Sequence, residues 1–330
     1  MTSSTPRIRV ERRPVHGVLL LDKPLGLSSN QALQKAKWLL RAEKAGHTGT
    51  LDPLASGVLP LCFGAATKFS QGQLDADKTY EATLRLGVTT TTGDAEGEVT
   101  AECAVPAITP DLLEAVRQRF LGRISQIPPM HSALKKDGKA LYAYARAGVE
   151  VDRAPRNVVI HALNMALAPD WQAQPAIELI VKCSKGTYIR TLGEDIGRAL
   201  GCGGHLTRLR RVATGPFDIG QCVTLDALGA MDEPCRIAQL HPPEVLLPDH
   251  AAITLAGEEA GRFLAGMRRR GPWPDADRVA VFGEQPRALL GTAHVKAGEL
   301  IPNRLLSPLE IQQILHAAPT QAALSPAFQA

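Results

Sequence analysis

The sequence predicts an α+β chain with a mixed sheet and two domains. Apolar runs of strand length alternate irregularly with helical segments, and neither a GxGxxG nor a Walker motif marks a doubly wound nucleotide-binding fold. A length of 330 residues is enough for about two domains. With 45% hydrophobic and 21% charged residues, the chain is able to bury a sizeable core, which argues against wholesale disorder.

The first expected elements are an arm, a strand and a helix. Residues 1–15 are basic and are predicted to form a flexible arm, and the apolar residues 16–21 suit a buried strand. A helix follows, because Ser28 or Ser29 is able to cap it. Its apolar side chains recur on one face at Leu33, Ala36 and Leu40.

A glycine-rich loop and a run of alternating elements come next. Residues 46–57 hold three glycines and a proline and predict a shaped loop. Residues 78–87 alternate in polarity, so we expect a half-buried strand with Tyr80 on its apolar face. The later predicted elements are a helix opened by Thr109 and Pro110, strands over 155–168 and 176–183, and a helix over 187–200.

The composition changes around residues 241–248, where a second domain is expected to begin. Acidic and basic side chains balance in residues 246–330, so the formal net charge of +4 belongs to residues 1–245. That modest excess neither proves nor excludes a nucleic-acid partner. We expect residues 246–310 to form short strands and turns, and the residues 311–330, without Asp, Glu, Lys or Arg, to form a flexible tail.

The cysteines and the apolar runs bear on location. No two of the six cysteines have C-x-x-C spacing, so neither a zinc ribbon nor a thioredoxin-type site is supported, and we expect no metal. Scattered cysteines in a long chain favour a reduced, cytoplasmic protein. The start of the chain lacks the apolar core of a signal peptide, and no apolar run has membrane-spanning length.

Asp52, Tyr188 and Arg190 are the candidates for chemistry. Asp52 follows a glycine-rich stretch and precedes Pro53, which would hold its carboxylate rigidly beside an apolar wall. The simpler interpretation is that Asp52 caps a turn. Tyr188 and Arg190 would share a face on a strand and diverge at a helix start, and an arginine beside a carboxylate keeps it ionised. An ordinary surface arginine and a core tyrosine remain the simpler alternative.

Two basic clusters suggest contact with phosphates. Residues 131–146 include Lys135 and Lys136, and residues 205–211 include three arginines and no acid. Solvated protein faces explain most such runs, but tyrosines close to one of them raise the odds of nucleic-acid contact. The predicted phosphate contacts are Lys135, Lys136, Arg208, Arg210 and Arg211, with the triplet Arg268–Arg270 as a further candidate.

Six segments taken together resemble a known family. They are residues 17–29, 46–62, 77–82, 126–146, 182–192 and 206–211. In this order they resemble the bacterial TruB family of tRNA pseudouridine-55 synthases, over most of residues 16–230. The resemblance implies a catalytic domain over residues 16–245 with a mixed, mainly antiparallel sheet. It also implies a small β-rich, PUA-like RNA-binding domain over residues 246–310.

The resemblance also implies a reaction without cofactor. A uridine in the T loop of tRNA, at position 55, would be flipped into a cleft, detached at N1 and reattached at C5. Asp52 would be the essential aspartate, and whether it attacks the sugar or the base or removes a sugar proton stays open. Arg190 would pair with it, Tyr80 would stack on the uracil, and Tyr188 and Leu209 would line the pocket.

Three other positions match the family's pattern, and their roles stay open. His47 would lie near the displaced base, or would only hydrogen-bond its own loop. Lys23 would order the active-site loop, in a role as structural as it is catalytic. Asp94 also matches, and no chemistry is assigned to it.

Two alternatives stay open beside a tRNA-modifying enzyme. One is a pseudouridine synthase for another RNA, including a guide-dependent one, and the other is a tRNA-folding chaperone that needs no Asp52. The expected partner is the T-arm stem-loop of tRNA, with no guide RNA, no DNA and no membrane. We expect a monomer.

Overall fold

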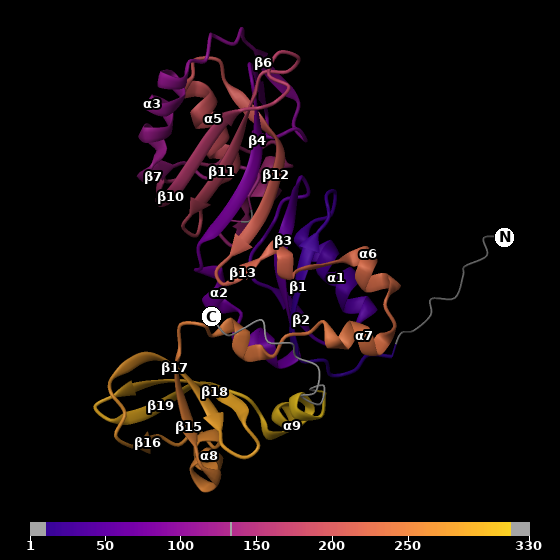
Figure 1. The fold of residues 1–330 in the computed structure, drawn as a ribbon, viewed down its shortest axis with the longest axis vertical. Helices are drawn as coiled ribbons and strands as arrows, with labels where there is room; N and C mark the ends of the chain where they lie inside the picture. Colours follow the sequence, from indigo (N-terminus) through magenta and orange to yellow (C-terminus); the bar gives the residue numbers. More distant parts are fainter. Residues whose placement is uncertain (1–10, 133, 318–330) are drawn as a thin grey trace, which may run out of the picture.

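The computed structural model describes residues 11–132 and 134–317, and Figure 1 shows them as two domains. The larger domain contains a ten-stranded sheet, and the C-terminal domain contains a five-stranded one. Both sheets are mostly antiparallel. The predicted α+β class, with a mixed and mainly antiparallel sheet and a β-rich C-terminal domain, is therefore confirmed. Within the described ranges, no helix combines the length and apolar character that crossing a membrane requires.

The large sheet has the strand order β14-β1-β3-β12-β4-β11-β10-β7, with β2 beside β3 and β13 beside β12. Only the β1–β14 and β3–β12 pairs are parallel. The strands are β1 Gly17–Lys23, β2 Ala45–His47, β3 Ala55–Phe63, β4 Lys78–Leu86, β7 Gly122–Gln126, β10 Arg156–Leu167, β11 Ala176–Cys183, β12 Gly204–Thr214, β13 Phe217–Asp218 and β14 Val223–Thr224.

Helices pack on this sheet and at its ends. The three longest are α1 Ser29–Leu39, α3 Pro110–Phe120 and α5 Ile189–Ala199, while α2 Gln71–Leu74, α4 Leu141–Ala145, α6 Leu225–Ala230 and α7 Glu233–Ala238 are short. Single 3-10 turns are η1 Gly64–Lys68, η2 Ile219–Gln221 and η3 Pro243–Leu246, and small hairpins pair β5 Val88–Thr90 with β6 Val99–Glu102 and β8 Lys135–Lys136 with β9 Lys139–Ala140.

Local sequence signals set several of these boundaries. Ser28 caps α1, because its hydroxyl accepts the Gln31 N–H at 3.2 Å and the Gln31 side chain accepts the Ser28 N–H at 2.8 Å. Thr109 caps α3, and Pro110 occupies its first position, as the sequence predicted. Along β4 every second side chain is buried, including Tyr80, which confirms the predicted half-buried strand. These apolar faces, with those of α1 and α5, form the main core.

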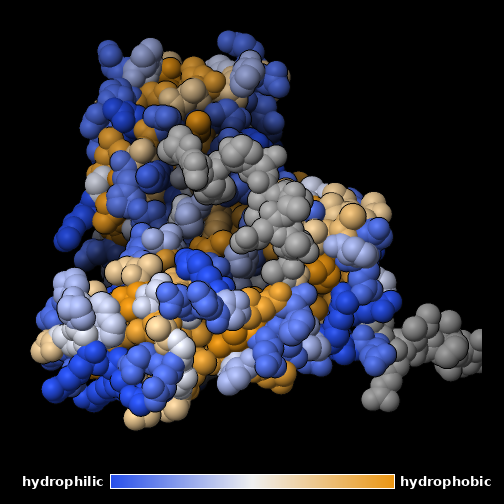
Figure 2. All heavy atoms as spheres, turned by 60° about the horizontal axis from the view of Figure 1, so that its bottom comes forward, coloured by the Kyte–Doolittle hydropathy of each residue, from blue (hydrophilic) through white to orange (hydrophobic). Residues whose placement is uncertain are grey.

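The C-terminal domain is a small sheet with the order β15-β17-β18-β19-β16. Its elements are β15 Ala251–Leu255, α8 Gly257–Leu264, β16 Arg269–Arg270, β17 Ala276–Gly283, β18 Ala288–Lys296, β19 Glu299–Leu305 and α9 Pro308–Ala317. Figure 2 brings this end of the molecule forward and shows a band of apolar atoms across the middle of the face. One apolar cluster joins residues of both domains, including Val18 and Leu20 of β1 and Phe282 and Leu289 of the small sheet.

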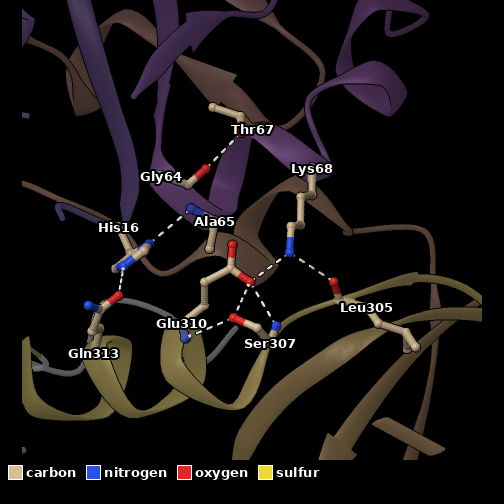
Figure 3. Close-up of polar contacts among 9 residues, drawn as sticks. All are labelled: His16, Gly64, Ala65, Thr67, Lys68, Leu305, Ser307, Glu310 and Gln313. Atoms are coloured by element: carbon tan, nitrogen blue, oxygen red, sulfur yellow. Dashed lines mark hydrogen bonds and ion pairs between the residues drawn. The ribbon is translucent and has the colours of Figure 1, made fainter. Parts of the chain in front are cut away.

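Helix α9 forms hydrogen bonds with side chains of the large domain (Figure 3). The Lys68 ammonium donates to a carboxylate oxygen of Glu310 at 2.6 Å. The His16 ring accepts the Ala65 N–H at Nδ1, at 2.9 Å, so its Nε2 carries the proton that is donated to the Gln313 side chain at 2.8 Å. The interdomain contact is therefore polar at its rim and apolar inside.

Two expectations about the chain ends need correction. Residues 311–317 are not a tail, since they belong to α9 and Ile311 and Ile314 pack against the apolar cluster shared by the domains. Residues 11–15 are not a loose arm, because Arg13 pairs through its backbone with Ala42 and Val15 is buried. The remainder of both expected segments, residues 1–10 and 318–330, lies outside the described residues.

Candidate active site

The loop between β2 and β3 carries Asp52 and is tied to helix α1. The Ser29 hydroxyl accepts the Leu51 N–H at 2.7 Å and donates to the Leu51 carbonyl at 3.1 Å. The Ala55 N–H closes the turn by donating to the Asp52 carbonyl at 3.0 Å. The predicted loop over residues 46–57 is shorter in the structure, because its first two residues lie in β2 and its last three in β3.

Gly57 shows why glycine is required at the end of this segment. Its φ is +105°, and a Cβ there would lie 2.1 Å from the Arg211 carbonyl oxygen. Only a residue without a side chain lets β3 approach β12 this closely. The glycine therefore fixes where the Asp52 loop lies relative to β12.

Asp52 forms an ion pair with Arg190 at the start of α5. The Arg190 Nη2 lies 2.8 Å from the Asp52 Oδ2, and the two side chains are 5% and 38% exposed, respectively. Arg190 also donates to the backbone carbonyls of Thr92 at 2.9 Å and His131 at 2.7 Å. The Asp52 carboxylate thus faces a buried guanidinium and is still accessible from outside.

The sequence assigned no role to Asp94. In the structure it completes a charge network with Arg190 and Asp52. It is 2% exposed and lies 3.5 Å from the Arg190 Nε. The Thr92 hydroxyl donates to it at 2.5 Å and the Glu96 N–H at 3.1 Å. Two carboxylates therefore hold the Arg190 guanidinium in one orientation. A lone aspartate in a Thr/Gly turn is the only sequence signal for this pairing.

A cavity of about 280 Å³ opens beside Asp52. Its lining includes the side chains that the sequence singled out, which come from the β2–β3 loop, β4, β12 and the start of α5: Asp52, Tyr80, Tyr188, Arg190 and Leu209. The sheet forms one side of this cavity, through Tyr80 of β4 and Leu209 and Arg211 of β12. The register of the two strands brings these side chains together, because Leu209 pairs with Ala82 and Arg211 pairs with Tyr80. A larger cavity of about 940 Å³ lies between β1, α1 and α6, and Asp52 is not part of its lining.

Besides Arg190, three buried cations lie around this site and donate to carbonyl oxygens: Lys23, Lys78 and Arg211. The Lys23 ammonium donates to the Pro24 and Leu27 carbonyls at 2.9 and 2.6 Å, and burial lowers the pKa of Lys23 to about 8 despite the opposing charge of Asp52. Burial and then the charge of Arg211 lower the pKa of Lys78 to about 8. Lys78 was missed from the sequence, although its position two before Tyr80 on a strand places both on one face.

Arg211 differs from its expected role. It was predicted to contact phosphates on the surface, but it is 1% exposed and its Nε donates to the Val58 carbonyl at 2.8 Å. The reason is strand alternation, since Arg211 shares the buried face of β12 with Leu209. Arg210 is half-buried and pairs with Asp22 at 2.7 Å.

The other predicted contacts lie on the surface or beside the cavity. Arg208 is exposed and pairs with Glu81 at 3.1 Å. Lys135 is exposed and Lys136 half-buried on the β8–β9 hairpin. Lys23 is fully buried and binds carbonyls of the turn between β1 and α1, and its predicted role in ordering the active-site loop stays a prediction.

His47 lies close to the site without lining the cavity. It is half-buried on β2, and burial lowers the pKa of His47. Its Nδ1 is buried and has no hydrogen-bond partner among the described residues. Nor do those residues contain a group of three or more His, Cys, Asp or Glu side chains arranged to hold a metal ion.

Comparisons with known proteins agree on one family. Residues 37–189 match the family described as TruB family pseudouridylate synthase (N terminal domain), and residues 190–248 match tRNA pseudouridylate synthase B C-terminal domain. The chain is 65% identical to tRNA pseudouridine synthase B of Verminephrobacter eiseniae, over 95% of each chain. It is 57% identical to the protein of that name from Ralstonia pickettii, over 89% of this chain and 95% of the other.

The fold is also found in a solved structure. A chain in the crystal structure of a Cbf5–Nop10–Gar1 complex is 25% identical, with a TM-score of 0.66 over 90% of this chain and 86% of the other. Its similarity extends across both domains of the present chain.

Proposed function

Because this chain belongs to the TruB family of pseudouridylate synthases, we propose that it isomerises uridine to pseudouridine in the T loop of tRNA, at position 55. It is an isomerase of the pseudouridine synthase type. The observation that carries the proposal is the convergence of Asp52, Tyr80, Tyr188 and Arg190, which are far apart in the chain, on one cavity. Such convergence is typical of a reaction centre.

The target uridine leaves the stack of the loop and enters the cavity. Flipping the base out of the stack costs a few kcal/mol. Stacking of the uracil on Tyr80 offsets this cost, since every base offers a π-face to an aromatic ring. Leu209 closes the apolar side of the pocket and excludes water from the base. Tyr188, at the start of α5, lines the same cavity and moves a proton at C5.

Asp52 acts on the nucleoside while Arg190 holds its carboxylate. The C1′–N1 bond breaks with its electron pair on N1, the base turns within the cavity, and C5 forms the new bond to C1′. The proton at C5 is lost and N1 gains one, so the reaction is balanced without an oxidant, a reductant or an imported group. This accounts for a function without cofactor in which one accessible carboxylate is essential.

RNA binding uses the charged surface around the cavity. Lys135, Lys136 and Arg208 contact phosphates, whereas Arg210 is a weaker candidate because its side chain is 27% exposed, against 51% for Arg208, and pairs with the half-buried Asp22. The C-terminal domain over residues 246–310 is the PUA-like RNA-binding unit. Affinity of this kind falls as salt rises, because phosphate contacts release counterions.

The test uses the purified full chain and an unmodified tRNA transcript, with no cofactor and no guide RNA. We expect stoichiometric pseudouridine at position 55, both in the full transcript and in an isolated T-arm stem-loop. Modification of other RNA only, or a requirement for a guide RNA, would contradict the proposed substrate. Sedimentation of the protein–RNA complex is expected to show one protein chain per RNA.

A further inference from the structure

The charges around the active-site cavity are unequal between its two sides. On the α5 side, Arg190 is matched by Asp52 and Asp94. On the sheet side, Arg211 and Lys78 are 1% and 9% exposed, and within the described residues neither has a carboxylate within 4.0 Å. In the part of the chain that the structure describes, the Lys78 ammonium donates hydrogen bonds to the carbonyls of Leu74 and Ala76 alone, at 2.8 and 2.5 Å.

Arg211 is part of the lining of the cavity and is held there by the sheet. It stands in register with Gly57 of β3 on one side and Tyr80 of β4 on the other. Its Nε is used by the Val58 carbonyl, while its Nη2 is buried and has no hydrogen-bond partner among the described residues. The guanidinium therefore keeps one buried donor unused beside the ring on which the uracil is proposed to stack.

A buried cation without a carboxylate is costly to fold. Removing a charge from water is repaid only by a partner of opposite charge or by several hydrogen bonds. Arg211 has one such bond in the described structure, and its charge also lowers the pKa of Lys78. An arrangement of this kind is useful where an anion arrives or develops during the reaction.

Resting on the proposed function, we propose that Arg211, assisted by Lys78, stabilises the negative charge of the uracil while it is detached from the ribose. When the C1′–N1 bond breaks, the electron pair stays on the base and the charge spreads over N1, O2 and O4. That charge is used up when C5 forms its bond to C1′; the C5 proton is then lost and N1 gains one, so the product base is neutral. Arg211 thus favours the intermediate over the bound uridine, which is what raises a rate.

A phosphate of the bound RNA is a less suitable partner for Arg211. Phosphates stay at the mouth of a cavity that receives only a base, whereas Arg211 lines the cavity itself and is 1% exposed. A phosphate contact would appear in the affinity for RNA. Stabilisation of the detached base would appear in the rate of the chemical step instead.

The experiment compares single-turnover rates of the full chain on T-arm stem-loops with uridine or 5-fluorouridine at the target position. Fluorine makes the detached base a better leaving group. For Arg211→Met we expect the loss of the target nucleoside to slow about 10²-fold on uridine RNA, with unchanged affinity. On 5-fluorouridine RNA the slowing should shrink to about tenfold, and Arg211→Lys should regain about tenfold on uridine RNA.

Controls separate this inference from the proposed function and from folding. Arg85→Gln removes a charge from β4 outside the cavity and should keep the wild-type rates. If the wild-type protein makes no pseudouridine, the proposed function fails. If it does, an equal loss on both bases, or a loss in affinity alone, overturns the inference. Should Arg211→Met not fold, Lys78→Met must show the same dependence on the leaving base.

Discussion

Replacing Arg190 by methionine should destabilise the large domain through Asp94. Asp94 is 2% exposed and would be left buried beside Asp52 without a cation. Removing one member of a buried ion pair costs about 3–5 kcal/mol. Because Asp94 keeps its bonds from the Thr92 hydroxyl and the Glu96 N–H, we expect a value near the lower end, about 3 kcal/mol.

This prediction is testable by urea unfolding and by thermal melting of the full chain. A loss of about 3 kcal/mol corresponds to roughly 6–12 °C for a domain of this size. Adding Asp94→Asn to Arg190→Met should recover about 1–2 kcal/mol, because the uncompensated carboxylate is gone. The matched control is Arg198→Met on the same helix, whose side chain is 75% exposed and pairs with Asp195; it should cost less than about 1 kcal/mol.

Two results would refute this reasoning. One is an Arg190→Met protein as stable as the Arg198→Met control. The other is a double variant whose destabilisation equals the sum of the two single ones, because additivity would mean that Arg190 and Asp94 are not coupled.

The remaining predictions concern the domain contact, the sheet and the thiols. Burial alone would raise the pKa of Glu310, but the hydrogen bonds from Lys68 and from the Ser307 N–H and hydroxyl, together with the Lys68 charge, outweigh it and lower the folded pKa from 4.5. Its contribution is therefore present above about pH 4.5 and lost as pH falls through the folded pKa, so Glu310→Gln should lower the melting temperature at pH 7 and have little effect near pH 3. Gly57→Ala should cost more than about 3 kcal/mol in urea unfolding, since its Cβ would overlap the backbone of β12; a smaller loss would show that β3 is able to shift. In native protein at pH 8, iodoacetamide should label exposed Cys103 and leave Cys62, whose pKa burial raises to about 12, unlabelled by mass spectrometry.

Local patterns in the sequence predicted most elements of the large domain. The alternation along β4, the caps of α1 and α3 and the paired strands β10 and β11 depend on neighbours in the sequence, and all are found. Helix α9 was not predicted, since a stretch without Asp, Glu, Lys or Arg and rich in Ala and Gln is typical of a tail. Its residues Ile311 and Ile314 are partly buried because apolar side chains of both domains lie beside them.

The site depended on topology that local patterns do not contain. The insertion of β12 between β3 and β4 decides that Arg211 is buried and Arg208 exposed. The contact of Asp94 with Arg190 likewise joins distant segments through the packing of α5. The resemblance to a family predicted Asp52 and the residues around it. The burial of Lys78 and Arg211 became clear only from the strands in the structure.

The most direct measurement of the central claim is single-turnover pseudouridine formation by Asp52→Asn, with RNA affinity measured in parallel. The substitution keeps the shape of the side chain and removes its charge beside Arg190. We predict a rate at least about 10³-fold below wild type, with RNA bound as tightly as before. Formation of pseudouridine at the wild-type rate would contradict the account.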